Sequence, residues 1–370
     1  MTYGTANIDA MATSTGQILG AGNSTAFKNR IINGAMVIDQ RNAGASVTVT
    51  SGYTGYAVDR FRIDPPVGQS ITGQQVTASL SGFQNALTYT AGTGSTNASD
   101  QSEIVYFIEG YNVADLQFGT ANAQTITLSF WAKSSLSGTF GLVLENNDRN
   151  RAYVTSYSLP TTNTWTYITK TIVGDTSGTW LYTNGRGIGI RWDMGAGTTY
   201  SGAVTNAWGA SPFIGITAGA GVVKLTQNTG ATFTITGVQL EVGTQATSFD
   251  YRDYTRELQM CQRYLPAWRS SSTQDILGNG AASGSNFYSF LSYETAPRIP
   301  PTGITYSSAS HFYANQYGSG GGAVSNVTFN SAGSGGIMIV LATSSMTSGS
   351  AGNFYFNSTQ GYIYGTGCEL

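Results

Sequence analysis

Alternating apolar and polar residues predict β-strands along much of the chain. Between residues 125 and 131, and again between residues 187 and 192, every second residue is apolar, which is the period expected of a strand with one buried face. The apolar positions are Ile126, Leu128 and Phe130 in the first segment and Ile188, Ile190 and Trp192 in the second. Turn-forming stretches such as Thr183-Asn184-Gly185 separate the segments. Strands at this spacing are typical of a β-sandwich rather than of βα units.

The apolar pattern changes phase once, within residues 231–242. The apolar residues before Gly237 stand at odd-numbered positions, and those after it stand at even-numbered positions. They are Phe233, Ile235, Val238, Leu240 and Val242. Because one extra residue restores the phase of the pleat, a β-bulge at Gly237 would place all five side chains on the core face. The alternative is that the strand ends near Thr236.

One segment has the period of a helix. From Arg252 to Leu265 the apolar residues recur at spacings of four, three and four, and Pro266 follows. This spacing places them on one face of a helix, which the proline ends. The residues are Tyr254, Leu258, Cys261 and Leu265. The segment is either a linker helix, residues 252–265, packed on the sandwich or, because the spacing is also heptad-like, a three-fold seam between chains.

The remaining residues, 266–370, are expected to form a smaller β-domain. Its apolar runs resemble short strands, and stretches of glycine and serine separate them. The runs are Asn286–Tyr293, Ile337–Leu341, Phe354–Phe356 and Tyr362–Tyr364. We expect the glycine-rich stretch Gly318–Gly322 to form an exposed loop, because glycine is too flexible to build a core.

Composition agrees with an all-β fold. The 370 residues include 48 Gly and 12% aromatic residues, whereas only 10% are charged, as in chains of short strands joined by tight turns. A hydrophobic content of 40% is enough for packed cores, so we expect two folded domains. Residues 1–27 contain few large apolar residues. We interpret them as an extended arm that docks on a partner.

Charge and cysteine content narrow the possible partners. The formal net charge is −2, without a run of Lys or Arg, so we expect no nucleic-acid partner. No apolar run approaches the ~20 residues that span a bilayer, and the N-terminus lacks the blocks of a signal peptide, so we expect synthesis in the cytoplasm without membrane insertion. Cys261 and Cys368 have no metal or redox spacing. Without disulfides, oligomerisation is the expected source of robustness.

The sequence offers few groups for catalysis. The single histidine, His311, lies in no nucleophile elbow and no zinc motif, so we expect it to be structural. Gly318–Ala323 is not followed by the helix that a phosphate site requires, and we expect no cofactor. A calcium site stays open, although no dense acidic loop supports one.

Glycan hydrolysis needs only two carboxylates at the right separation, and it therefore stays an alternative. The acids nearest to aromatic or loop contexts are Glu103, Glu109, Glu145 and Asp148. No pair among them stands out, so we do not expect an enzyme.

Binding is better supported than catalysis. The chain has 22 Tyr and 6 Trp among many Asn, Thr and Ser residues, and exposed aromatic rings stack on sugars while their polar tips form hydrogen bonds. The second domain concentrates candidate ligand-binding residues at Tyr306, His311, Phe312, Tyr313, Tyr317 and Tyr355. The alternative for each one is half-buried packing within a strand.

Several short blocks of sequence, taken in order and spacing from residue 28 to about residue 264, resemble a family of phage and prophage tail fibre proteins. The blocks are Phe27–Asn42, Tyr56–Arg62, Ser129–Ser135, Thr164–Tyr167, Gly174–Trp180, Phe233–Gly243, Phe249–Arg252 and Glu257–Tyr264. The last third of the chain resembles the family only loosely, at Ala296–Arg298 and at the Gly367–Leu370 end. The resemblance carries over no catalytic residue.

The resemblance implies a jelly-roll sandwich like that of a carbohydrate-binding module, followed by a helix and a small β-domain, in a homotrimer within the virion. We therefore expect residues 1–27 to anchor the chain to other tail or baseplate proteins, residues 28–251 to form the sandwich, and residues 266–370 to bind host surface polysaccharide. The expected function is non-enzymatic attachment by a tail fibre. The alternatives are a structural spacer on the head or baseplate and a glycan depolymerase.

Overall fold

The computed structural model describes residues 10–12, 18–20, 28–210, 212–318, 320–343 and 346–370. The described part of the chain is 46% strand and 6% helix, which confirms the predicted all-β class. Most of the predicted arm, residues 1–27, lies outside the described residues; within it, β1 (Ala10–Ala12) pairs with β2 (Ile18–Gly20). None of the helices in the described part is long and apolar enough to cross a membrane.

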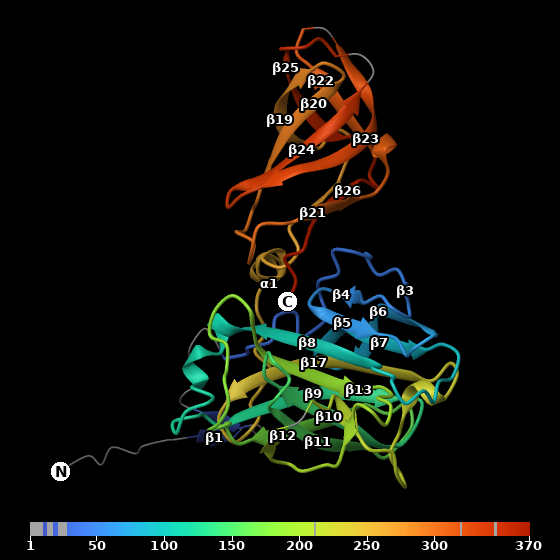
Figure 1. Ribbon diagram of the computed structural model, residues 1–370, viewed down its shortest axis with the longest axis vertical. Helices are drawn as coiled ribbons and strands as arrows, with labels where there is room; N and C mark the ends of the chain where they lie inside the picture. Colours follow the sequence, from blue (N-terminus) through green and yellow to red (C-terminus); the bar gives the residue numbers. More distant parts are fainter. Residues whose placement is uncertain (1–9, 13–17, 21–27, 211, 319, 344–345) are drawn as a thin grey trace, which may run out of the picture. The chain divides into compact units, whose positions relative to one another are not determined.

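The chain divides into two compact units. The first ends at Tyr254 and also contains Leu370, and the second runs from Thr255 to Glu369. In Figure 1 the strands of the first unit run from blue to yellow, and those of the second from orange to red.

The first unit is a jelly-roll-like sandwich of two sheets. One sheet has the order β15 (Trp208–Gly209), β11 (Ala152–Leu159), β10 (Gly138–Glu145), β13 (Arg186–Asp193), β8 (Glu103–Glu109), β5 (Phe61–Asp64), β4 (Gly55–Val58). The other has the order β12 (Thr166–Ile172), β9 (Ile126–Ser134), β17 (Thr232–Val242), β7 (Phe83–Ala91), β6 (Ser70–Leu80), β3 (Val47–Thr50). The smaller elements are β14 (Ser201–Gly202), β16 (Gly215–Ile216), η2 (Gly110–Asn112), η3 (Ala114–Leu116) and η4 (Leu225–Gln227).

The predicted alternation places the core between these two sheets. Phe130 of β9 meets Trp192 of β13 at a ring-centroid distance of 5.8 Å, and Phe140 of β10 meets Phe233 of β17 at 5.7 Å. All four rings are fully buried. The strand predictions for residues 125–131 and 187–192 are therefore confirmed.

The predicted bulge in β17 is also present. The register shifts between Thr236 and Gln239, and Gly237 has a φ of +62°. Four of the five apolar side chains of this segment are buried as predicted, but Val242 is 42% exposed. The prediction is wrong there because Val242 is the last residue of the strand, beyond the packed part of the core.

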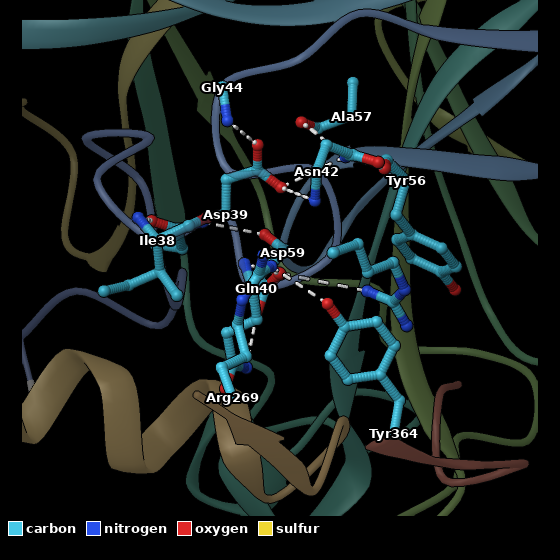
Figure 2. Close-up of polar contacts among 12 residues, drawn as sticks. Ile38, Asp39, Gln40, Asn42, Gly44, Tyr56, Ala57, Asp59, Arg269 and Tyr364 are labelled. Carbon is cyan, nitrogen blue, oxygen red and sulfur yellow. Dashed lines mark hydrogen bonds and ion pairs between the residues drawn. The ribbon is translucent and has the colours of Figure 1, made fainter. Parts of the chain in front are cut away.

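Polar side chains hold the turns of residues 28–46, which form no strand. Asp39 accepts hydrogen bonds from the backbone N–H groups of Asn42 (2.9 Å) and Gly44 (2.8 Å), and Asn42 donates to the carbonyl of Tyr56. Asp59 accepts from the backbone N–H of Gln40 at 3.0 Å. Figure 2 shows these contacts. Side chains thus satisfy backbone groups that a sheet would otherwise pair.

The second unit contains a closed six-stranded barrel. Its strands follow the order β19 (Ile276–Ser283), β20 (Asn286–Ser292), β24 (Gly336–Thr343), β23 (Gly320–Ala332), β22 (Phe312–Gln316), β25 (Ala351–Phe356). A three-stranded sheet has the order β18 (Ala267–Arg269), β26 (Tyr362–Thr366), β21 (Gly303–Tyr306), and η5 (Ala309–His311) precedes β22. Phe287, Leu341 and Phe354 are fully buried in the core of this unit.

The expectation of a loop at Gly318–Gly322 is wrong in part, because β23 begins at Gly320. A Cβ atom on Gly321 would lie 2.4 Å from Cε1 of Tyr313 on the neighbouring strand. Glycine is therefore used here for close packing within a sheet rather than for loop flexibility.

Candidate functional site

A groove of about 840 Å³ lies on the outer face of the six-stranded sheet of the sandwich. Side chains of β9 and β12 form its floor, and the segment after β17 forms a wall. The lining residues are Ser81, Gly82, Phe83, Ser129, Trp131, Tyr167, Thr169, Thr171, Gly237, Thr244, Gln245, Ala246, Thr247, Ser248, Phe249 and Tyr251. Rings and hydroxyl groups therefore dominate the lining.

Two aromatic rings lie side by side on the floor. Trp131 of β9 and Tyr167 of β12 are direct cross-strand partners, with ring centroids 5.1 Å apart and planes inclined by 39°. Ser129 and Thr169 form the neighbouring outward pair on the same two strands. Alternation along each strand thus sets a ring pair beside a hydroxyl pair.

A second aromatic cluster meets the floor at the bulge. Phe83 contacts Phe249 at 5.1 Å and Tyr251 at 5.7 Å between ring centroids, and the Tyr251 hydroxyl donates to the carbonyl of Gly82. A Cβ atom on Gly237 would lie 2.7 Å from Cζ of Phe83 and 3.2 Å from Cδ1 of Trp131. The glycine therefore permits both the left-handed backbone and the approach of the two rings.

Buried polar groups fix the wall. Glu241, on β17, accepts from the backbone N–H of Thr247 at 2.9 Å, from its hydroxyl at 2.6 Å and from Gln239 Nε2 at 2.8 Å. Gln239 in turn accepts from the backbone N–H of Asp250 at 2.8 Å. Both side chains are almost fully buried. They therefore hold the segment that carries Phe249 and Tyr251 instead of facing a ligand.

The hydroxyl of Tyr167, on the floor of the groove, has a shifted pKa. Burial raises the pKa of Tyr167, and the negative charge of Glu241 acts in the same direction. The phenol therefore stays protonated and can donate a hydrogen bond at neutral pH. Among the described residues that line the groove, none carries a charged side chain.

Two of the acids that were considered for glycan hydrolysis lie close together, but outside the groove. Glu103 and Glu145 both pair with Arg191, on the seven-stranded sheet, and all three side chains are buried. Burial raises the pKa of Glu103 to about 7, although Arg191 opposes the shift. Asp148 is exposed, with a hydrogen bond from Asn147. None of these acids lines the groove.

The predicted ligand-binding residues of the second unit differ from one another in burial. Phe312 is 1% exposed and packs against Phe354 and Phe356, so it belongs to the core and cannot reach a ligand. Along β22 buried and half-buried residues alternate, so the side chain of Tyr313, which follows Phe312, points outward. Tyr317 is exposed as well.

The other members lie nearby on the same unit. Tyr355 is the cross-strand partner of Tyr313, with ring centroids 5.4 Å apart. Tyr306 donates to Oδ1 of Asn326 at 2.9 Å, and Nδ1 of His311 lies 3.0 Å from the hydroxyl of Ser307. Local hydrogen bonds thus occupy Tyr306 and His311, whereas Tyr313 and Tyr355 face outward together.

The predicted helix is observed as α1 (Tyr254–Gln262), which is shorter at both ends than the expected 252–265. Its hydrogen bonding continues to Leu265, whose N–H donates to the carbonyl of Cys261, and stops at Pro266, which has no N–H. Tyr254 is 62% exposed and Leu258 half-buried, whereas Cys261 and Leu265 are buried. The three-fold seam through these residues stays a prediction.

The sequence prediction of ligand-binding residues missed the groove, although a signal for it existed. Trp131, Tyr167, Gly237 and Tyr251 all belong to blocks that carried the family resemblance. Each lies in a different block, and only the pairing of β9 with β12 and β17 brings them together.

No family model matches the chain, and no curated protein matches it. Among solved structures, tailspike protein 4 of bacteriophage CBA120, described as its enzymatically active domain, matches 58% of this chain and 21% of its own, with 11% identity and a TM-score of 0.29. The chain thus spans about a fifth of that protein.

Two smaller proteins match over nearly their whole length. A CBM4 structure matches 57% of this chain and 98% of its own, with 16% identity and a TM-score of 0.29. The family 11 carbohydrate-binding module of Clostridium thermocellum, in complex with a β-1,3-1,4-mixed-linked tetrasaccharide, matches 55% of this chain and 97% of its own, with 11% identity and a TM-score of 0.27.

Proposed function

We propose that this chain is an attachment protein of a bacteriophage particle and that the groove over β9 and β12 binds a glycan of the host surface. The pairing of Trp131 with Tyr167 beside the hydroxyls of Ser129 and Thr169 supports the proposal most directly. Sugar rings present apolar faces and hydroxyl edges, so stacking and hydrogen bonding together recognise them.

The lining also favours a particular ligand. Because no charged side chain occurs among the described residues of the groove, a neutral sugar chain would bind without leaving a charge unpaired. The groove of about 840 Å³ is large enough for several sugar units. Its aromatic clusters lie on the floor and at the wall, so a chain rather than a single sugar would contact both.

We further propose that the chain is a tail fibre, made in the host cytoplasm, that assembles as a homotrimer in the virion. Residues 1–27 would attach to other tail or baseplate proteins. The sequence resemblance supports this assignment. Three copies of a weak site on one fibre would gain avidity through effective concentration, so shallow stacking sites would be sufficient for adhesion.

Two other functions make different predictions. A depolymerase would need a carboxylate pair beside the sugar, whereas Glu103 and Glu145 are buried with Arg191 outside the groove. A structural spacer would bind no glycan. We therefore propose binding without cleavage.

Adsorption of the full chain to extracted host surface polysaccharide tests the proposal. Replacing Trp131 and Tyr167 together by Ala should weaken binding by at least about tenfold, equivalent to roughly 1.4 kcal/mol, without shortening the polymer. Tyr53→Ala is the matched control, since Tyr53 is exposed in the same unit but outside the groove. Equal affinity of the double variant and the parent would contradict the groove assignment, and shortened polymer would indicate a hydrolase.

A further inference from the structure

Three asparagines form a row across neighbouring strands of the barrel. Asn279 of β19 lies directly opposite Asn353 of β25, which lies directly opposite Asn315 of β22. On these strands the alternate residues Ala282, Phe354 and Ala314 fill the core. The asparagine side chains therefore share the outer face of the barrel. Figure 1 labels the three strands in the orange-to-red part of the chain.

The row has unused hydrogen-bonding capacity. Within the described part of the chain, none of the three side-chain amides makes a hydrogen bond to another residue, and Oδ1 of Asn353 is buried without a partner. An amide offers two donor hydrogens and an acceptor oxygen. Asn279 is exposed and the other two side chains are half-buried, so the row presents donors and acceptors to a ligand, apart from the buried Oδ1 of Asn353.

A pair of tyrosines lies beside the row. Tyr355 and Tyr313 are cross-strand partners two residues along the same strands, which places them about 7 Å from the asparagines. Their ring centroids are 5.4 Å apart and their planes are inclined by 36°. The ring of Tyr313 extends over Gly321 of the next strand, where a Cβ atom would meet it at 2.4 Å.

Small residues occupy part of this face. The next outward pair beyond the asparagines is Ala281 with Ala351, and the partner of Tyr313 on β23 is Ala323. All three are exposed. Larger apolar side chains border the face on the other side, where Phe290 lies opposite Asn279 and Ile276 lies opposite Tyr355.

The barrel is also uncharged. None of its six strands contains Asp, Glu, Lys, Arg or His. An anionic ligand would therefore find no counter-charge on the strands themselves. Rings, amides and the absence of charge together fit a neutral sugar, whose ring face stacks while its hydroxyls donate and accept.

We propose that this face of β19, β25 and β22 is a second carbohydrate-binding site, in which Tyr313 and Tyr355 stack on a neutral pyranose and Asn279, Asn353 and Asn315 hydrogen-bond its hydroxyl groups. The proposal rests on the proposed function for the class of ligand, but not on the groove of the sandwich. It gives the second unit its own contact with the glycan.

Binding of the full chain to an array of neutral hexasaccharides of glucose, galactose, mannose and xylose tests the site. The chain with Trp131→Ala and Tyr167→Ala should keep measurable binding to at least one sugar. Adding Asn353→Ala or Tyr355→Ala to it should reduce that residual affinity at least tenfold. Matched controls are Asn330→Ala, since Asn330 is exposed on the barrel away from the row, and Tyr53→Ala, since Tyr53 is exposed in the sandwich outside the groove.

The outcomes separate the two sites. If the groove variant loses all binding while the parent binds, the second site is overturned and the groove stands. If Asn353→Ala and Tyr355→Ala, in the groove variant, bind as tightly as the controls, the second site is overturned as well. If the groove variant binds like the parent but the barrel changes abolish binding, the second site stands and the groove is wrong. Absence of any binding by the parent overturns both.

Discussion

At Gly237 a single residue determines both the register of a strand and the shape of the groove. Its φ of +62° belongs to the left-handed region that side chains rarely adopt, and it lies where Phe83 and Trp131 approach the backbone. The phase change in the sequence was enough to predict the bulge. It could not predict the two rings, because Phe83 and Trp131 come from other strands.

Replacing Gly237 by Ala should lower the free energy of unfolding by about 1–3 kcal/mol, since it adds backbone strain and a steric conflict with Phe83. Urea unfolding followed by circular dichroism measures the change. Gly219→Ala is the control and should have an effect within about 0.5 kcal/mol, because a Cβ there meets no atom within 4 Å. Equal stability of the two variants would contradict the role assigned to Gly237.

Glu103 should make stability depend on pH. Burial raises its pKa from 4.5 to about 7, so the folded chain holds this proton more tightly than the unfolded chain. The stabilisation is fully present below pH 4.5 and is lost as the pH rises through about 7. Glu103→Gln cannot lose a proton and should therefore lose less stability than the parent between pH 5 and pH 8.

Unfolding free energies of both chains at these two pH values measure the difference, with the exposed Asp148→Asn as the control that should follow the parent. A variant that follows the parent's pH dependence would show that Arg191 keeps Glu103 charged throughout.

The wall of the groove depends on β17. Glu241 receives three hydrogen bonds from Gln239 and Thr247, and it is buried under the segment that carries the wall aromatics. Sequence patterning places Glu241 on the polar face of a strand, where a solvent-exposed acid is the usual outcome. Glu241 is buried because the segment after β17, which includes Thr247, folds back over it.

Glu241→Ala should leave the sandwich folded but loosen residues 244–251, because buried donors lose their acceptor at a cost of about 1–3 kcal/mol. Hydrogen exchange of the Thr247 amide should become faster, while amides of β9 keep their protection. Gln245→Ala, an exposed change in the same segment, is the control. Unchanged exchange at Thr247 would contradict the anchoring role of Glu241.

Elements were easier to predict than their neighbours in space. Alternation identified β9, β13 and β17, and the apolar runs after residue 266 correspond to β20, β24, β25 and β26. Alternation could not give the pairing of β9 with β12, which creates the Trp131–Tyr167 floor, because hydrogen-bonded register depends on the whole sheet. The same limit explains why Phe312, a candidate ligand-binding residue, is buried in the core. The position of a residue in the alternation of its strand, rather than its residue type, decides which face its side chain is on.

The whole molecule combines a sandwich that carries a polar aromatic groove with a barrel whose strands contain no charged residue. Both surfaces are proposed to bind neutral sugars. Assembly into a trimer would multiply each weak contact.

The proposed trimer has a direct test. Sedimentation equilibrium of the full chain should give three times the mass of one chain at micromolar concentration. Substituting Leu258 by Lys should shift the mass toward that of one chain if the α1 seam joins the copies, because the added charge would be buried between chains. Ala121→Lys, an exposed change elsewhere, is the control. A single-chain mass for the parent would contradict the trimer.

We propose that the groove over β9 and β12 holds a sugar chain. A crystal structure of the full chain soaked with the host polysaccharide fragment that it binds most tightly would locate the bound sugar. We predict a sugar ring stacked on Trp131 or Tyr167 with a hydroxyl bonded to the exposed Thr169. A fragment bound elsewhere on the molecule, with this groove empty, would contradict it.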